Sequence, residues 1–136
     1  MPDERTGFLK RANIATLATV GPLGHPHAVP IWYLYEDGKF LMISPKGAQK
    51  VKNLRRTGRA TLVIDRREIP YFAVTAHGFV EVGKAPSEDL YFRWASHYLG
   101  DDLGRRYVSA RRREDEVCLL LQPDRITEFR SGLDQL

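Results

Sequence analysis

The side chains best suited to bind an anion lie in one basic segment, residues 44–56. Lys46, Lys50 and Asn53 fall within about 60° of one another on a helical wheel. With the Ser44 hydroxyl and the free N–H groups at the start of a helix, they would suit a phosphate monoester. The same pattern is typical of a surface helix with solvated lysines, and the residues alone leave both interpretations open.

A second segment, PHAVPIWY at residues 26–33, is a candidate for binding a flat ring. Its proline at position 30 has no N–H, so it predicts a bulge or an edge position and frees neighbouring backbone groups. An aromatic-rich strand of this kind would form a wall for a planar ligand. At strand positions, residues such as Trp32 and Tyr33 more often pack in the core than contact a ligand.

Other candidate chemistry is excluded by its sequence context. The four histidines, at positions 25, 27, 77 and 97, are scattered. The His-x-His pair lacks a third ligand nearby, so no metal site is predicted. No G-x-S-x-G motif marks a nucleophilic serine. Cys118, the single cysteine, lies in an apolar run and is expected to be an inert thiol. No catalytic side chain is identified.

Composition narrows the class of protein further. The 136 residues predict one domain over 1–136, and 43% apolar residues argue against disorder. No apolar run reaches the roughly 20 residues that span a bilayer, and no secretory signal opens the chain, so a cytoplasmic protein without membrane contact is expected. The net charge is only +4. Acidic residues follow the basic cluster at 105–113 directly, so no nucleic-acid partner is expected.

These candidate residues must be positioned by a largely β chain. Alternating or apolar runs predict strands at 12–20, 25–35, 40–44, 59–65, 71–82, 117–121 and 126–129. Helices are predicted at 3–11, at 45–57 with Ser44 as N-cap, from the Ser87 cap to Gly100, and at 105–113. Tight turns between successive strands favour antiparallel pairing. The fold class is therefore mainly β (α+β), with six or seven strands that close into a barrel.

The ordered segments resemble a known superfamily. NIATLATV (13–20), GPLGHPHAVPIWY (21–33) and KVKNLRRTGRATLVID (50–65) are similar to the pyridoxamine 5′-phosphate oxidase-like proteins, over roughly residues 8–130. Within them the chain looks most like the small group that uses FMN or the deazaflavin F420. The resemblance implies a split β-barrel of the FMN-binding type, which works as a homodimer with two cofactors in grooves between the subunits.

The resemblance also implies site residues. The cofactor phosphate would be held by Ser44, Lys46 and Lys50, with Lys52 and Asn53 beside them. The ring would lie against residues of the second and third strands: Val29, Pro30, Ile31, Trp32 and Met42. The partner subunit would contribute the strand around His77 and residues 125–129. An acidic F420 tail would meet Lys52, Arg55 and Arg56.

The expected function is an oxidoreductase that transfers hydride from FMN or F420 to a small planar unsaturated acceptor. The alternative is a non-catalytic carrier that binds a cofactor or a tetrapyrrole. The chain ends at Leu136 without the basic C-terminal segment that grips substrate in true pyridoxamine phosphate oxidases. Vitamin B6 oxidation is therefore not expected.

Overall fold

The computed structural model describes residues 3–132 of the chain. Its elements are, in order, α1 (Glu4–Leu9), β1 (Ala15–Val20), β2 (Pro26–Ile31), β3 (Tyr33–Glu36), β4 (Lys39–Pro45), α2 (Gln49–Thr57), β5 (Arg59–Arg66), β6 (Phe72–Val82), α3 (Glu88–Ser109), the 3₁₀ turn η1 (Arg113–Asp115) and β7 (Glu116–Arg130). All seven strands pair antiparallel in one sheet, in the order β2-β1-β5-β6-β7-β4-β3. The predicted mainly β architecture is confirmed.

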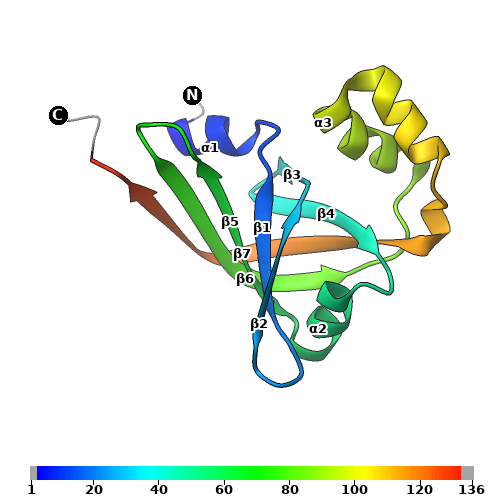
Figure 1. Cartoon of the computed structure of the whole chain (residues 1–136), viewed down its shortest axis with the longest axis horizontal. Helices are drawn as coiled ribbons and strands as arrows, with labels where there is room; N and C mark the ends of the chain where they lie inside the picture. The colour runs from blue at the N-terminus through cyan, green and yellow to red at the C-terminus, as the bar shows by residue number, and fades with distance from the viewer. Residues whose placement is uncertain (1–2, 133–136) are drawn as a thin grey trace.

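The sheet curls because its two edge strands are consecutive in the sequence. β2 ends at Ile31 and β3 begins at Tyr33, so Trp32 alone separates the two ends of the strand order. The result is the curled half-barrel of Figure 1, with α2 at one end and α3 beside β4. The predicted single strand at 25–35 is therefore wrong, since the chain changes edges at Trp32. Pro30 does lie on an edge strand, as its missing N–H predicts.

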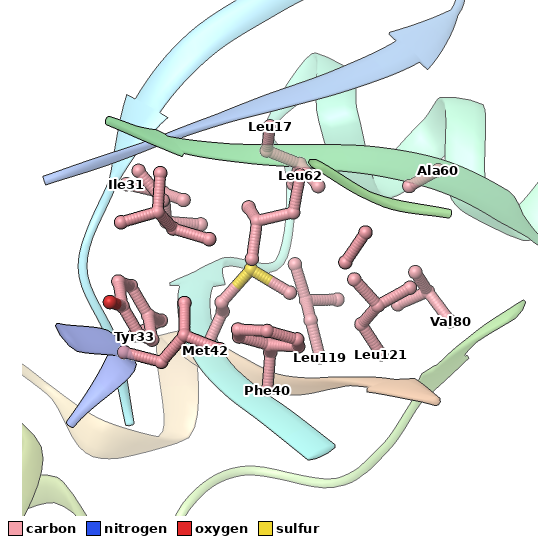
Figure 2. Packing of buried hydrophobic residues seen from close by; sticks show 14 of the residues in the cluster. Leu17, Ile31, Tyr33, Phe40, Met42, Ala60, Leu62, Val80, Leu119 and Leu121 are labelled. Atoms are coloured by element: carbon pink, nitrogen blue, oxygen red, sulfur yellow. The ribbon is translucent and has the colours of Figure 1, made fainter. Parts of the chain in front are cut away.

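The inner face of the curled sheet holds the main core. The predicted alternation along β6 is confirmed, because Phe72, Val74, Ala76 and Val80 are all buried. Figure 2 shows the Met42 side chain pointing into this interior, among aliphatic and aromatic residues of several strands. At about 25 cal/mol per Å² of apolar surface, burial of this kind dominates the stability of the fold.

A second, smaller core lies on the outer face of β3 and β4, where α3 covers them. It is built from Leu34 and Ile43 of the strands and from Tyr91, Trp94 and Ala95 of α3. The Ser87 hydroxyl caps this helix by accepting a hydrogen bond from the Leu90 N–H, 3.1 Å away, as predicted.

Two further predictions about elements need correction. The strands expected at 117–121 and 126–129 are one continuous strand, β7, with a register shift opposite His77 and Gly78. Gly100 interrupts α3 with φ 80° rather than ending it, and helix resumes directly to Ser109. Glycine adopts this left-handed region without strain, so the helix folds back into two limbs (Figure 1).

Candidate functional site

A groove forms where the β2–β3 junction, β4, α2 and α3 meet. Its volume is about 330 Å³, at the lower end of the range for small-molecule sites. It is lined by Ile14, Pro30, Ile31, Trp32, Ile43, Lys50, Trp94 and Tyr107. The structure therefore brings together four residues that the sequence suggested separately: Pro30, Ile31 and Trp32 of the proposed wall, and Lys50 of the proposed anion site.

Lys50 is the one cation among the residues described around this groove. It lies half-buried on α2, and desolvation lowers the pKa of its amino group, an effect that the Glu116 carboxylate opposes. No carboxylate of the described residues lies within ion-pair distance of it. The Glu116 carboxylate instead accepts a hydrogen bond from the Tyr91 hydroxyl at 3.1 Å. A desolvated cation without a close counter-ion favours an anionic ligand.

The aromatic wall of the groove is held rigidly. Trp32 stacks on Tyr98 with ring centroids 4.8 Å apart and an interplanar angle of 7°. The Trp94 indole N–H donates to the Trp32 carbonyl at 3.2 Å. The Tyr98 hydroxyl accepts from the Tyr33 N–H at 2.9 Å and donates to the Asn13 carbonyl at 2.7 Å. These contacts fix the strand break at the wall, so a flat ligand meets a surface that is already formed.

The aromatic residues from α3 were missed as site residues. Trp94 and Tyr107 line the groove, although neither is close to the basic segment or to residues 26–33 in the sequence. Trp94 and Tyr98 are aromatic residues four positions apart, a spacing that indicates one packed side of this helix. Its placement over β3 and β4 depends on tertiary contacts that no local pattern specifies.

The predicted helix start at Ser44 is wrong. β4 runs through Pro45, Ser44 pairs with Val117 of β7, and α2 begins only at Gln49 after Ala48 as N-cap. Ser44 is 1% exposed and its hydroxyl donates to the Pro45 carbonyl. Lys46 is an exposed residue of the connecting turn rather than of the first helical turn. The long-range pairing with β7 overrides the local Ser-Pro capping signal.

Asn53 does not share a face with the lysines. It is fully buried beside Val51 and Leu54, and its amide donates to the Thr19 hydroxyl at 3.0 Å and accepts from Gln49 at 2.8 Å. The helical-wheel expectation that grouped it with Lys46 and Lys50 is wrong. Its role in this structure is to tie α2 to β1.

The remaining predicted residues lie in several environments. Met42 is fully buried in the main core. Val29 is half-buried and lies opposite Leu17, which places both side chains on the inner face. Lys52 is exposed on α2. His77 lies in a different groove, on the outer face of the sheet, where its Nδ1 is 2.8 Å from the Thr61 hydroxyl.

Within 3–132, no three His, Cys, Asp or Glu side chains come together as metal ligands. No helix in this same range has the length and hydropathy to cross a bilayer.

Comparisons with solved structures show the fold. A conserved hypothetical protein from Mycobacterium tuberculosis matches all of this chain and 89% of its own, with 23% identity and a TM-score of 0.79. An F420 reductase matches 93% of this chain and 98% of its own, with 20% identity and a TM-score of 0.76. A haem storage protein from Vibrio cholerae matches 95% of this chain and 93% of its own, with 18% identity and a TM-score of 0.70.

At the level of sequence, no curated protein matches the chain. The family described as pyridoxamine 5′-phosphate oxidase does match it, over residues 1–130. That match spans nearly the whole sequence, including every strand and every residue that lines the groove at Lys50. The chain therefore belongs to the pyridoxamine 5′-phosphate oxidase family.

Proposed function

We propose that the chain is an oxidoreductase that binds FMN or F420 in the groove at Lys50 and passes hydride to a small planar unsaturated acceptor. The observation that carries this proposal is the meeting of a half-buried cation with a rigid aromatic wall in one groove. Both cofactors combine a flat ring with a phosphate, so they match those two features. The similarity of fold to an F420 reductase supports the same class of ligand.

The chain's own residues would bind the cofactor and orient it. Lys50 neutralises the phosphate charge, and because it is partly desolvated the interaction is less screened than on an open surface. Pro30, Ile31 and Trp32 hold one face of the ring and exclude water from it. The bound cofactor supplies the hydride chemistry. Ser44, Met42 and Asn53 have no part in this proposal, because their side chains are buried away from solvent.

The proposal includes a homodimer. On the outer face of the sheet, Val63, Thr75 and Thr127 lie in one row across β5, β6 and β7, and Phe129 lies opposite Ala73. Phe79 and Phe129 are each 59% exposed. An uncharged row with exposed aromatic residues suits contact with a second copy, which would bring a second chain toward the groove and add His77 to it.

The test is a titration of the purified chain with FMN and with F420, followed by absorbance and fluorescence. Lys50→Ala should weaken binding by about 10- to 100-fold, since a charge-assisted phosphate contact contributes roughly 1.5–3 kcal/mol. Lys10→Ala, an exposed lysine at the end of α1 that does not line the groove, is the control and should leave the affinity unchanged. Equal affinity of the two variants would place the phosphate elsewhere, and binding of neither cofactor would overturn the proposal.

A turnover assay distinguishes an enzyme from a non-catalytic carrier. Reduced cofactor should be consumed when quinones or enones are added, whereas pyridoxamine 5′-phosphate should not be oxidised. Binding without any conversion of these acceptors would instead support a non-catalytic carrier. A tetrapyrrole carrier has weaker support from the groove, because the residues described around it include no histidine, cysteine or methionine as an axial ligand.

A further inference from the structure

A second cleft, formed by α3 and the turn that follows it, is separate from the groove at Lys50. It has a volume of about 530 Å³ and shares no lining residue with that groove. Four arginines line it: Arg105, Arg111, Arg112 and Arg113. We name it the arginine cleft. A volume of this size accommodates a ligand of ordinary small-molecule dimensions.

The cleft exists because α3 folds back on itself. Gly100 breaks the helix with φ 80°, and the second limb returns along the first. At Gly104 the limbs are in close contact, since a Cβ there would lie 2.9 Å from the Ser96 Cα. The Arg105 guanidinium then lies over the Phe92 ring, 5.4 Å from its centroid. The cleft is thus bounded by both limbs of α3 and by the turn that follows them.

The ion pairs of its arginines are long, although Arg113 also donates to the Pro86 carbonyl at 3.1 Å and Arg111 to the Tyr107 carbonyl at 3.4 Å. The ion pairs Arg105–Asp102, Arg112–Asp115 and Arg113–Glu88 have N···O distances of 3.8, 3.9 and 3.9 Å. Exposed pairs with this geometry contribute little stability, so the guanidinium groups keep donors available for a ligand. Two glutamates, Glu88 and Glu114, also line the cleft. Asp102 and Asp115, which pair with Arg105 and Arg112, balance the remaining charge of the four arginines. The cleft would therefore attract an anion through its guanidinium donors rather than through a net positive charge.

The floor of the cleft is aromatic. Tyr91 is 2% exposed, and Phe92 beside it is half-buried. A ring placed on this floor would gain apolar and stacking contacts, while a carboxylate at its end would accept paired N–H bonds from a guanidinium. We propose that the arginine cleft is a second ligand site, which binds a small aromatic carboxylate.

The surroundings of the cleft favour a small anion over a nucleic acid. Asp102, Glu114 and Asp115 lie among the arginines along the chain, and Glu88 faces them from the first limb. These carboxylates would repel an extended phosphate backbone. A single carboxylate that fits between the guanidinium groups avoids most of that repulsion.

The experiment is an NMR titration of the ¹⁵N-labelled full chain with 2-naphthoate. The amide shifts should map to residues 88–92 and 105–114. Arg105→Gln combined with Arg112→Gln should weaken binding about tenfold, which corresponds to the loss of about 1.4 kcal/mol. The matched control is Arg93→Gln combined with Arg106→Gln, two exposed arginines of α3 outside the cleft, and it should leave the affinity unchanged.

Three comparison ligands test whether the cleft requires both the ring and the carboxylate of 2-naphthoate. The neutral 2-naphthamide and inorganic phosphate should each bind much more weakly than 2-naphthoate. Equal binding of the amide would show that the cleft recognises only an apolar ring. Equal binding of phosphate would show that it recognises only an anion. Displacement of 2-naphthoate by a single-stranded oligonucleotide that depends on Arg105 and Arg112 would indicate a nucleic-acid surface instead, and each of these results overturns the proposal.

A further control distinguishes binding in the arginine cleft from binding in the groove at Lys50. If Lys50→Gln, rather than the arginine substitutions, weakens 2-naphthoate binding, the ligand occupies the groove at Lys50 and the arginine cleft is not its site. Failure of FMN and F420 to bind would overturn the proposed function and leave this result unaffected.

Discussion

Lys50 combines a positive charge with a half-buried position, and at the residue scale this combination makes its ligand affinity sensitive to pH. Desolvation lowers the pKa of its amino group from 10.5, against the opposing effect of the Glu116 carboxylate. The unfolded chain therefore binds this proton more tightly than the folded chain. The charged Lys50 amino group therefore destabilises the folded state at neutral pH. This cost is relieved as the pH rises from the lowered pKa towards the ordinary value of 10.5.

Phosphate binding should follow the protonated form of Lys50. The FMN phosphate is a dianion above pH of about 7, so it contributes no titration of its own in the alkaline range. Affinity should fall as the pH rises through the lowered pKa, at a pH below that of an ordinary lysine. Lys50→Arg, whose guanidinium stays charged, should show a flat profile over the same range. Superimposable profiles of the two proteins would contradict the assignment.

Tyr98 is the second residue whose effect can be isolated. Tyr98→Phe removes the hydroxyl that pairs with the Tyr33 N–H and the Asn13 carbonyl at the strand break. Leaving those groups unpaired should lower the free energy of unfolding by about 1–3 kcal/mol in a urea titration. Tyr107→Phe is the control, because the Tyr107 hydroxyl has no hydrogen-bond partner within residues 3–132. An equal loss in both variants would show that the ring environment, rather than the hydroxyl, is responsible.

At the scale of elements, the β6–β7 pair depends on one glycine. A Cβ at Gly78 would lie 2.1 Å from the Gln122 carbonyl oxygen, next to the register shift between the strands. Gly78→Ala should therefore cost about 1–3 kcal/mol or more, since backbone atoms on β7 must move. Unfolding in urea measures the change.

Gly47 provides the matched control for this substitution. It lies in the turn before α2, where a Cβ would meet nothing within 4 Å. Gly47→Ala should be neutral or stabilise by up to about 1 kcal/mol, because it restricts the unfolded chain. If both variants lose the same stability, the close approach at Gly78 is not the cause.

The elements also show where local patterns were reliable. The alternation of β6 and the Ser87 cap depend on residues close together in the sequence, and both are confirmed. The turn between β3 and β4 is equally local, with φ values of 53° at Asp37 and 75° at Gly38. The start of α2 depends on a distant strand instead. β7 pairs with Ser44 and Pro45, and the Lys46 N–H donates to the Asp115 carbonyl, so the chain stays extended where local signals favoured a helix.

At the scale of the whole molecule, the proposed homodimer can be tested through the outer face of the sheet. Thr75 lies between Val63 and Thr127 at the centre of the uncharged row. Thr75→Arg should place a charge within the contact and shift the protein from dimer to monomer in sedimentation equilibrium. Ala85→Arg, an exposed position between β6 and α3, should leave the dimer intact. A monomeric parent protein would contradict the proposal directly.

Patterns within short stretches of sequence predicted the β-rich class, most of the elements and two parts of the candidate site, the wall at 30–32 and the lysine at 50. These features follow from burial periodicity, turn chemistry and residue type within short windows. Contacts between distant segments bring the two parts to one groove, bury Asn53 against Thr19 and place Trp94 and Tyr107 of α3 in the lining. No short stretch could predict these features, because strand order, sheet curling and helix placement minimise the free energy of the whole chain through contacts between segments far apart in sequence.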